Sequence, residues 1–71
     1  MSASSFLAVL ETAKGEFVPV QNDNQARGYR AVELWVFGVP TTPAHRQALD
    51  AAKAALDTPA PRKIHYLYYD Q

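Results

Sequence analysis

The sequence contains no cysteine, which excludes disulfide bonds and thiolate metal sites. Small secreted domains usually depend on disulfides, so this absence also disfavours a secreted scaffold. No apolar run approaches the roughly 20 residues that a helix needs to cross a bilayer. The first five residues lack the basic region and apolar stretch of a secretory signal peptide. These absences predict a cytoplasmic protein that has no contact with a membrane.

The chain also lacks an excess of charge of either sign. Lys plus Arg and Asp plus Glu number 7 each. A balanced chain has no net field that would steer a polyanion or an acidic membrane toward it. The composition therefore counts against general nucleic-acid binding, and only a local basic patch stays open as a route to it.

The length of 71 residues predicts a single domain over residues 1–71, with residues 1–4 as a flexible lead-in. Hydrophobic residues make up 48% of the chain and charged residues 20%, as in a globular protein. A domain of this size buries only about 60% of the surface of its unfolded chain. There is no room for a deep cleft, and such a domain often gains stability by covering an apolar face with a partner.

The most strand-like stretch is 29–39, which holds the only tryptophan and many β-branched and aromatic residues. Alternation along a strand predicts that one face carries Val32, Leu34 and Val36. The other face is predicted to carry Ala31, Glu33, Trp35 and Phe37. A strand that is apolar on both faces is normally central in its sheet.

Two shorter strands are predicted before this stretch, over residues 6–12 and 16–20. Gly15 would supply the positive-φ residue of the hairpin loop between them. The rival interpretation is a helix over residues 4–14, with Gly15 as its C-cap. Pro19 has no N–H to donate to a neighbouring strand, which predicts that the second strand lies at an edge of the sheet.

A helix is predicted to start with Thr42 as its N-cap and Pro43 at its first position. It should run to about Asp57, where Pro59 and Pro61 enforce its end. The apolar residues recur at spacings of three and four, and many are small. This face is predicted to contain Ala48, Leu49, Ala52, Ala55 and Leu56.

Two further segments complete the pattern. Residues 21–28 are polar and rich in turn formers, which predicts an exposed loop or a long hairpin tip. Residues 62–69 form a fourth strand by composition. The predicted order is β-β-β-α-β, a small α+β domain whose four-stranded sheet has one helix packed on one face. Since the strands offer apolar residues to both sides, we expect the uncovered face to meet another protein surface.

The candidate partner-binding residues are mainly aromatic, with two charged neighbours. They are Trp35, Phe37, Tyr66, Tyr68, Glu33 and Arg30. Tryptophan and tyrosine combine a large contact area with a polar group and dominate interface hot spots. The alternative is that the aromatic residues fill a small core. Glu33 is unusual on its face, and an edge position, a salt bridge to Arg30 or Arg62, or an interface contact would each account for it.

A second function is open for the same aromatic residues. Beside Arg30, Arg62 and Lys63 they could stack the bases of a single-stranded nucleic acid. The balanced charge disfavours this alternative, because such proteins usually carry a clear excess of basic residues.

The sequence offers little for catalysis or metal binding. His45 is expected on the exposed first turn of the helix and His65 on a strand face beside tyrosines, whereas a metal site needs about three or four ligands. No sharp nucleophile turn and no phosphate-cradling glycine loop is present. We therefore expect no enzyme activity, no metal and no cofactor. The predicted function is a protein-interaction module, as an inhibitor or accessory regulator that binds a protein partner or forms a homodimer.

Overall fold

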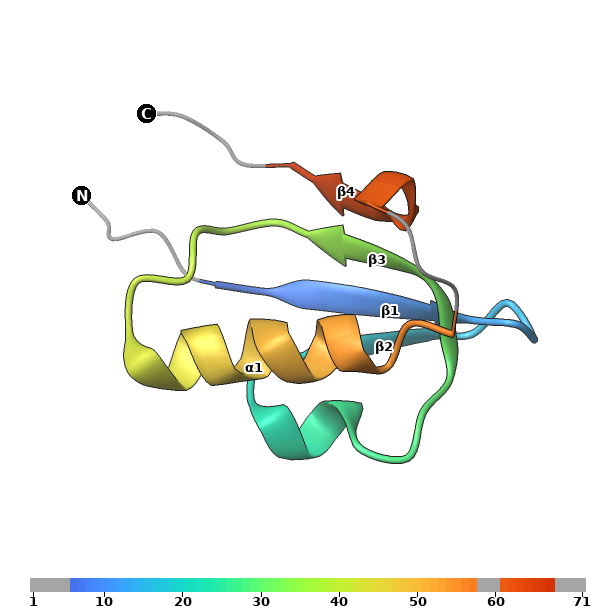
Figure 1. The fold of residues 1–71 in the computed structure, drawn as a ribbon, viewed down its shortest axis with the longest axis horizontal. Coiled ribbons are helices and arrows are strands. Elements are labelled where there is room, and N and C mark those ends of the chain that lie inside the picture. Colours follow the sequence, from blue (N-terminus) through green and yellow to red (C-terminus); the bar gives the residue numbers. More distant parts are fainter. Residues whose placement is uncertain (1–5, 58–60, 68–71) are drawn as a thin grey trace.

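The fold is built on a four-stranded sheet with the strand order β2-β1-β3-β4 (Figure 1). The computed structural model describes residues 6–57 and 61–67. The strands are β1 (Ala8–Thr12), β2 (Phe17–Val20), β3 (Ala31–Val36) and β4 (Ile64–Tyr66). The helix is α1 (Pro43–Ala54), and short 3-10 turns form η1 (Asp23–Ala26) and η2 (Pro61–Lys63). The predicted β-β-β-α-β order and the α+β class are confirmed.

The β1–β2 hairpin closes through a short turn that depends on glycine. Gly15 has φ +86°, and its N–H donates to the Thr12 carbonyl at 2.9 Å. The Thr12 N–H donates to the Glu16 carbonyl at 2.9 Å, and the Thr12 hydroxyl accepts from the Glu16 N–H at 3.1 Å. The predicted hairpin is therefore confirmed, and the rival helix is wrong. Pro19 lies in β2, which is an edge strand as predicted.

Strand β3 lies between β1 and β4, so its predicted central position is confirmed. The prediction that Ala31 shares a face with Trp35 is wrong. Glu11 pairs with Glu33, but the next residue of β1, Thr12, pairs with Ala31, so Val32 is an additional residue in β3. This bulge turns Ala31 toward the helix side, where it is fully buried.

Helix α1 begins as its sequence predicts. The Thr42 hydroxyl accepts a hydrogen bond from the His45 N–H at 3.1 Å, and Pro43 occupies the first turn. The His45 ring stacks on Phe6 with the ring centroids 5.4 Å apart. His45 is therefore half-buried, and the expectation of an exposed histidine is wrong.

The helix ends at Ala54, three residues before the predicted Asp57. The chain leaving the helix pairs with the start of β3 instead of continuing as a helix. The Ala31 N–H donates to the Ala55 carbonyl, and the Asp57 N–H donates to the Ala31 carbonyl, both at 2.8 Å. Pro59, which was predicted to stop the helix, lies outside the described residues.

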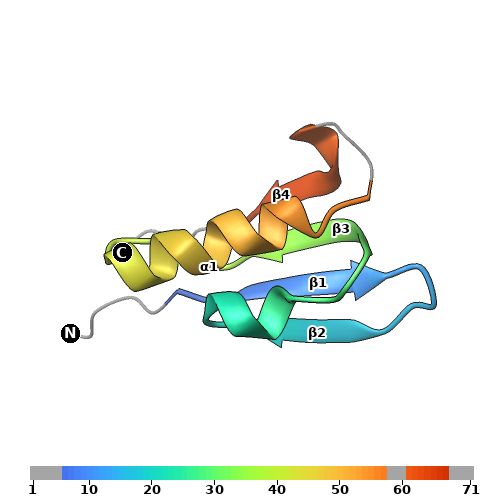
Figure 2. The same cartoon turned by 60° about the horizontal axis from the view of Figure 1, so that its bottom comes forward.

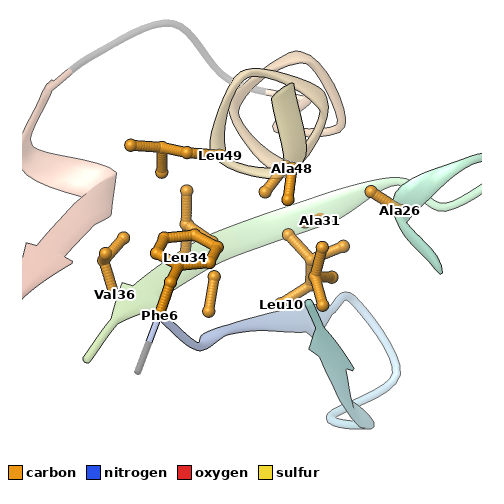
Figure 3. Packing of buried hydrophobic residues seen from close by; sticks show 11 residues of the cluster. Phe6, Leu10, Ala26, Ala31, Leu34, Val36, Ala48 and Leu49 are labelled. Carbon is orange, nitrogen blue, oxygen red and sulfur yellow. The ribbon is translucent and has the colours of Figure 1, made fainter. Parts of the chain in front are cut away.

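The core lies between α1 and the sheet (Figure 3). Its buried residues are Phe6, Ala8, Leu10, Val20, Ala26, Ala31, Leu34, Val36, Ala48, Leu49 and Ala52. Ala55 and Leu56 pack against this cluster, so the predicted apolar face of the helix is confirmed. The alanines carry little side-chain volume, which lets the helix lie close to the strands.

Residues 21–28 form an ordered loop around η1. The Asn22 side chain accepts from the Gln25 N–H at 3.2 Å, and the Gln25 side chain accepts from the Asn22 N–H at 3.1 Å. This reciprocal pair is a capping box. The exposed loop is confirmed, but the hairpin-tip alternative is wrong, because β3 pairs with β1 and not with β2.

The last strand is shorter than predicted. β4 covers Ile64–Tyr66, while Arg62 and Lys63 belong to η2. Tyr68 and the predicted flexible residues 1–4 lie outside the described residues. Within residues 6–57 and 61–67, no helix has the length and apolar character needed to span a membrane.

Candidate interaction face

The side of the sheet opposite α1 carries a continuous set of side chains, which we call the open face. Strand alternation and register assign to it Leu7, Val9, Glu11, Phe17, Pro19, Glu33, Trp35, Phe37 and His65. Both α1 and η1 lie on the other side of the sheet (Figure 2). The open face is therefore covered by neither α1 nor η1.

One row of the open face crosses all four strands. Pro19 lies opposite Val9, Val9 opposite Trp35, and Trp35 opposite His65. At the end of this row the Trp35 and His65 rings are stacked, with centroids 4.1 Å apart and an interplanar angle of 20°. The parallel pairing of β4 with β3 produces this stack, since it places the two residues side by side.

The indole nitrogen of Trp35 is enclosed and has no hydrogen-bond partner among the described residues. A buried donor without a partner costs free energy, because it has given up its hydrogen bonds to water. Within the described residues, the indole N–H of Trp35 thus lacks the hydrogen-bond partner that buried donors usually have.

Glu33 forms a polar contact with the same histidine. The His65 Nε2–H donates to the Glu33 Oε2 at 3.0 Å, and both side chains are half-buried. This hydrogen bond is the main cause that lowers the pKa of the Glu33 carboxyl below its ordinary value. Burial opposes the decrease, while the His65 charge, a hydrogen bond with Glu11 and the Lys63 charge add to it. A salt bridge of Glu33 to Arg30 or Arg62 was one of the expected explanations. The contact found in the structure is with the His65 ring instead.

A second row of the open face contains two glutamates in direct opposition. Glu11 on β1 pairs with Glu33 on β3, and Phe17 lies on the outer side of Glu11. Like charges directly opposite each other destabilise a sheet. Within the described part of the chain, neither carboxylate has a lysine or arginine nitrogen within 4.0 Å. The open face thus combines an apolar row with a pair of carboxylates next to it.

The structure brings together half of the predicted partner-binding residues. Trp35, Phe37 and Glu33 share the open face. Tyr66 pairs with Val36 and so belongs to the helix side of β4, where it is 47% exposed. Arg30 precedes β3 and is exposed outside the strand. Tyr68 lies outside the described residues.

Sequence reasoning missed most of the contribution of β1 and β2 to this face. The missed residues are Leu7, Val9, Glu11, Phe17 and Pro19. The alternation of buried and half-buried positions along β1 was readable from its sequence, because Leu7, Val9 and Glu11 interleave with Ala8 and Leu10. The contact between His65 and Glu33 had no local signal, since the two residues are far apart in the chain.

A further candidate among the described residues is a hollow of about 260 Å³ between η1 and the end of α1. Four of its lining residues are alanines, and the others are Arg27, Gly28 and Tyr29. The Arg27 side chain is exposed and lies 3.7 Å from Asp23. This lining has too few convergent polar groups for catalysis. The described residues also contain no group of three or more ligand side chains that could hold a metal ion.

Comparisons with known protein families, curated proteins and solved structures find no match to this chain. Its function is therefore inferred from the geometry of the open face.

Proposed function

We propose that this chain is a small, non-enzymatic protein-interaction module whose open face binds another protein surface, either a partner protein or a second copy of the chain. The observation that supports this proposal is the apolar row through Val9 and Trp35, which lies on the side of the sheet away from α1. Phe17, beside this row, remains 62% exposed. Covering apolar surface of this kind is the main favourable term in protein association.

The open face has properties that suit recognition. Its side chains project from paired strands, so little conformational entropy is lost when a partner binds. Trp35 and Phe37 are the large aromatic side chains that most often dominate binding energy in interfaces. The half-buried state of Trp35 keeps part of its ring accessible to a partner.

We propose further that it acts in the cytoplasm as an inhibitor or accessory regulator and not as an enzyme. A domain of 71 residues has little room for a cleft with convergent polar groups. A flat face can still block or bridge a larger protein, because binding needs matching surfaces and not a deep pocket.

Nucleic acid is a weaker candidate for the same face. Glu11 and Glu33 lie on it and would repel phosphates. The Trp35 ring is stacked on His65, so one of its faces is already occupied and is not available to a base.

The proposal is tested by quantitative pull-down from the native lysate with nuclease present, together with sedimentation velocity of the purified protein. The variants are Trp35→Ala and Phe37→Ala, with Tyr29→Ala as the control, because Tyr29 is exposed but lies outside the open face. Circular dichroism checks that each variant folds. We expect the two open-face variants to lose a partner or a dimer that wild type and Tyr29→Ala retain. A wild-type protein that is monomeric and captures no protein, or one whose capture is unchanged in all variants, contradicts the proposal.

A further inference from the structure

We infer that the surface covering the open face is that of another protein, which combines apolar side chains with an arginine or lysine placed against Glu11 and Glu33. This inference rests on the proposed function and adds the chemistry of the partner to it. The features that carry it are the opposed glutamates, the absence of a lysine or arginine of the described residues within 4.0 Å of either carboxylate, and the apolar row beside them.

Within the described residues the opposed glutamates are compensated only in part. Glu11 and Glu33 face each other across antiparallel strands, an arrangement that costs stability. His65 serves only Glu33, through the 3.0 Å contact with Oε2. Positions that break a local rule of folding are expected at functional sites. Glu33 has the His65 contact and the more distant Lys63 charge, whereas Glu11 has its hydrogen bond with Glu33 but no salt bridge to a lysine or arginine of the described residues.

When a partner covers the open face, the need for a cation beside Glu11 and Glu33 becomes greater. An apolar surface placed over Val9 and Trp35 also removes water from the neighbouring carboxylates. A desolvated carboxylate without a partner is costly, whereas one paired with a cation and hydrogen-bonded is tolerated. A partner that carries a basic side chain at this point therefore binds, and a purely apolar partner is rejected.

The distance between the apolar residues and the glutamates is short enough for one helix or strand of a partner to contact both. Val9 and Glu11 are two residues apart on β1, and Trp35 and Glu33 are two residues apart on β3. Side chains at this separation on one face of a strand lie about 7 Å apart. Arginine suits the position better than lysine, because its planar guanidinium can donate to two carboxylate oxygens at once.

A second copy of this chain fits the open face poorly. A two-fold axis that runs along the strands between β1 and β3 places Glu11 of each copy against Glu33 of the other. A two-fold axis across the strands places the two glutamates over the apolar end of the face. At that end the Phe37 N–H donates to the Leu7 carbonyl. The first arrangement opposes like charges, and the second buries carboxylates without a cation.

The test uses two synthetic amphipathic peptides of about 15 residues, long enough to form a helix. One combines leucine with arginine, and its counterpart replaces every arginine by glutamate. Binding is followed by calorimetry and by the fluorescence of Trp35, which is the only tryptophan in the chain. The protein variants are Glu11→Gln and Glu33→Gln, with Glu16→Gln as the matched control in the exposed hairpin turn. Glu11→Gln is the cleaner variant, because Glu33→Gln also alters the contact with His65.

We expect wild type to bind the arginine peptide and not the glutamate peptide. Glu11→Gln should weaken binding about 10-fold, the effect of losing a charge-assisted hydrogen bond. Glu16→Gln should bind as wild type does, and Trp35→Ala should lose binding in calorimetry.

Each of the following results overturns the inference. The first is equal binding of both peptides, or no binding of the arginine peptide. The second is a wild-type dimer that Trp35→Ala dissociates, which assigns the open face to a second copy. The third is weakened binding in Trp35→Ala and Phe37→Ala but not in Glu11→Gln. The second and third results leave the proposed function standing, whereas binding that no open-face variant changes rejects both.

Discussion

The two faces of the sheet are made from alternate residues of the same strands, yet they have different physical properties. On β3, Leu34 is fully buried under α1, while its neighbour Trp35 is half-buried on the open face. On β1, Leu10 is fully buried, while Glu11 is half-buried beside a second glutamate. One strand thus contributes to the core with one set of residues, and with the other set it contributes to the face for which we propose binding.

Polar groups distinguish the two faces most clearly. Within the described residues, the buried positions on the helix side are apolar except for Thr12, whose hydroxyl is used by the Glu16 N–H. The open face holds Glu11, Glu33 and His65 among its apolar residues. The helix side therefore accounts for folding, and we propose binding as the reason for the polar groups of the open face.

The largest expected effect is on the free energy of unfolding, when two adjacent residues that lie on opposite faces of β3 are each replaced by alanine. Leu34→Ala removes a fully buried side chain, and we expect it to lower the free energy of unfolding by about 2–5 kcal/mol. Trp35→Ala deletes a larger side chain, but its half-buried position should make the loss smaller. Urea denaturation of both variants measures the difference. An equal or greater loss for Trp35→Ala would mean that the open face belongs to the core.

The hairpin turn sets which residues of β2 reach each face, so its glycine should have the next largest effect. Gly15 has φ +86°, and no atom lies within 4 Å of the position that a Cβ would occupy, so only backbone strain opposes a side chain. We expect Gly15→Ala to cost about 1–2 kcal/mol in thermal or urea unfolding. Gly15→Asn should cost less, because asparagine tolerates this conformation better. Equal costs for the two variants would contradict a conformational cause.

The helix cap should affect only the covered side of the sheet. Thr42→Ala removes the acceptor for the His45 N–H, and we expect a loss of about 1 kcal/mol in unfolding free energy. Thr41→Ala is the control, since Thr41 is exposed and makes no capping bond to α1. Peptide binding at the open face should be unchanged in both variants. A change in binding would show that the two faces are coupled.

The smallest effect should be a pH dependence that is specific to the open face. The pKa of Glu33 is lowered in the folded state, so its contribution to stability is fully present above the ordinary glutamate pKa of about 4.3. That contribution is lost as the pH falls through the lowered folded pKa. Urea unfolding between neutral and acidic pH should show a smaller acid loss for Glu33→Gln than for wild type. Parallel curves would contradict the role of the His65 contact in this shift.

Local signals in the sequence were sufficient for several elements. Gly15 indicated the hairpin, Pro19 indicated an edge strand, and the Thr42–Pro43 pair indicated the helix start. Each of these depends on the conformation of a few neighbouring residues, which is why a single sequence can reveal it.

Long-range pairing could not be predicted in the same way. Ala31 turned out to lie on the helix side because the register between β1 and β3 shifts at Glu11 and Thr12. A shift of one residue exchanges the faces of a strand, and its position depends on a partner strand elsewhere in the chain. The contact of His65 with Glu33 likewise depends on β4 lying parallel to β3 after α1. For this reason the sequence indicated Trp35, Phe37 and Glu33 on one face, but not the contact of Glu33 with His65.

The order of the strands in space has a consequence for synthesis. β3 is an inner strand of the finished sheet, but the strand that covers its second edge, β4, is made only after α1. Until then, the edge along Leu34, Trp35 and Val36 is open on a segment with high β-propensity. Such edges pair readily with other chains. β4 pairs with β3 over three residues and closes this edge, so the edge of β3 is open to such pairing until β4 has been made.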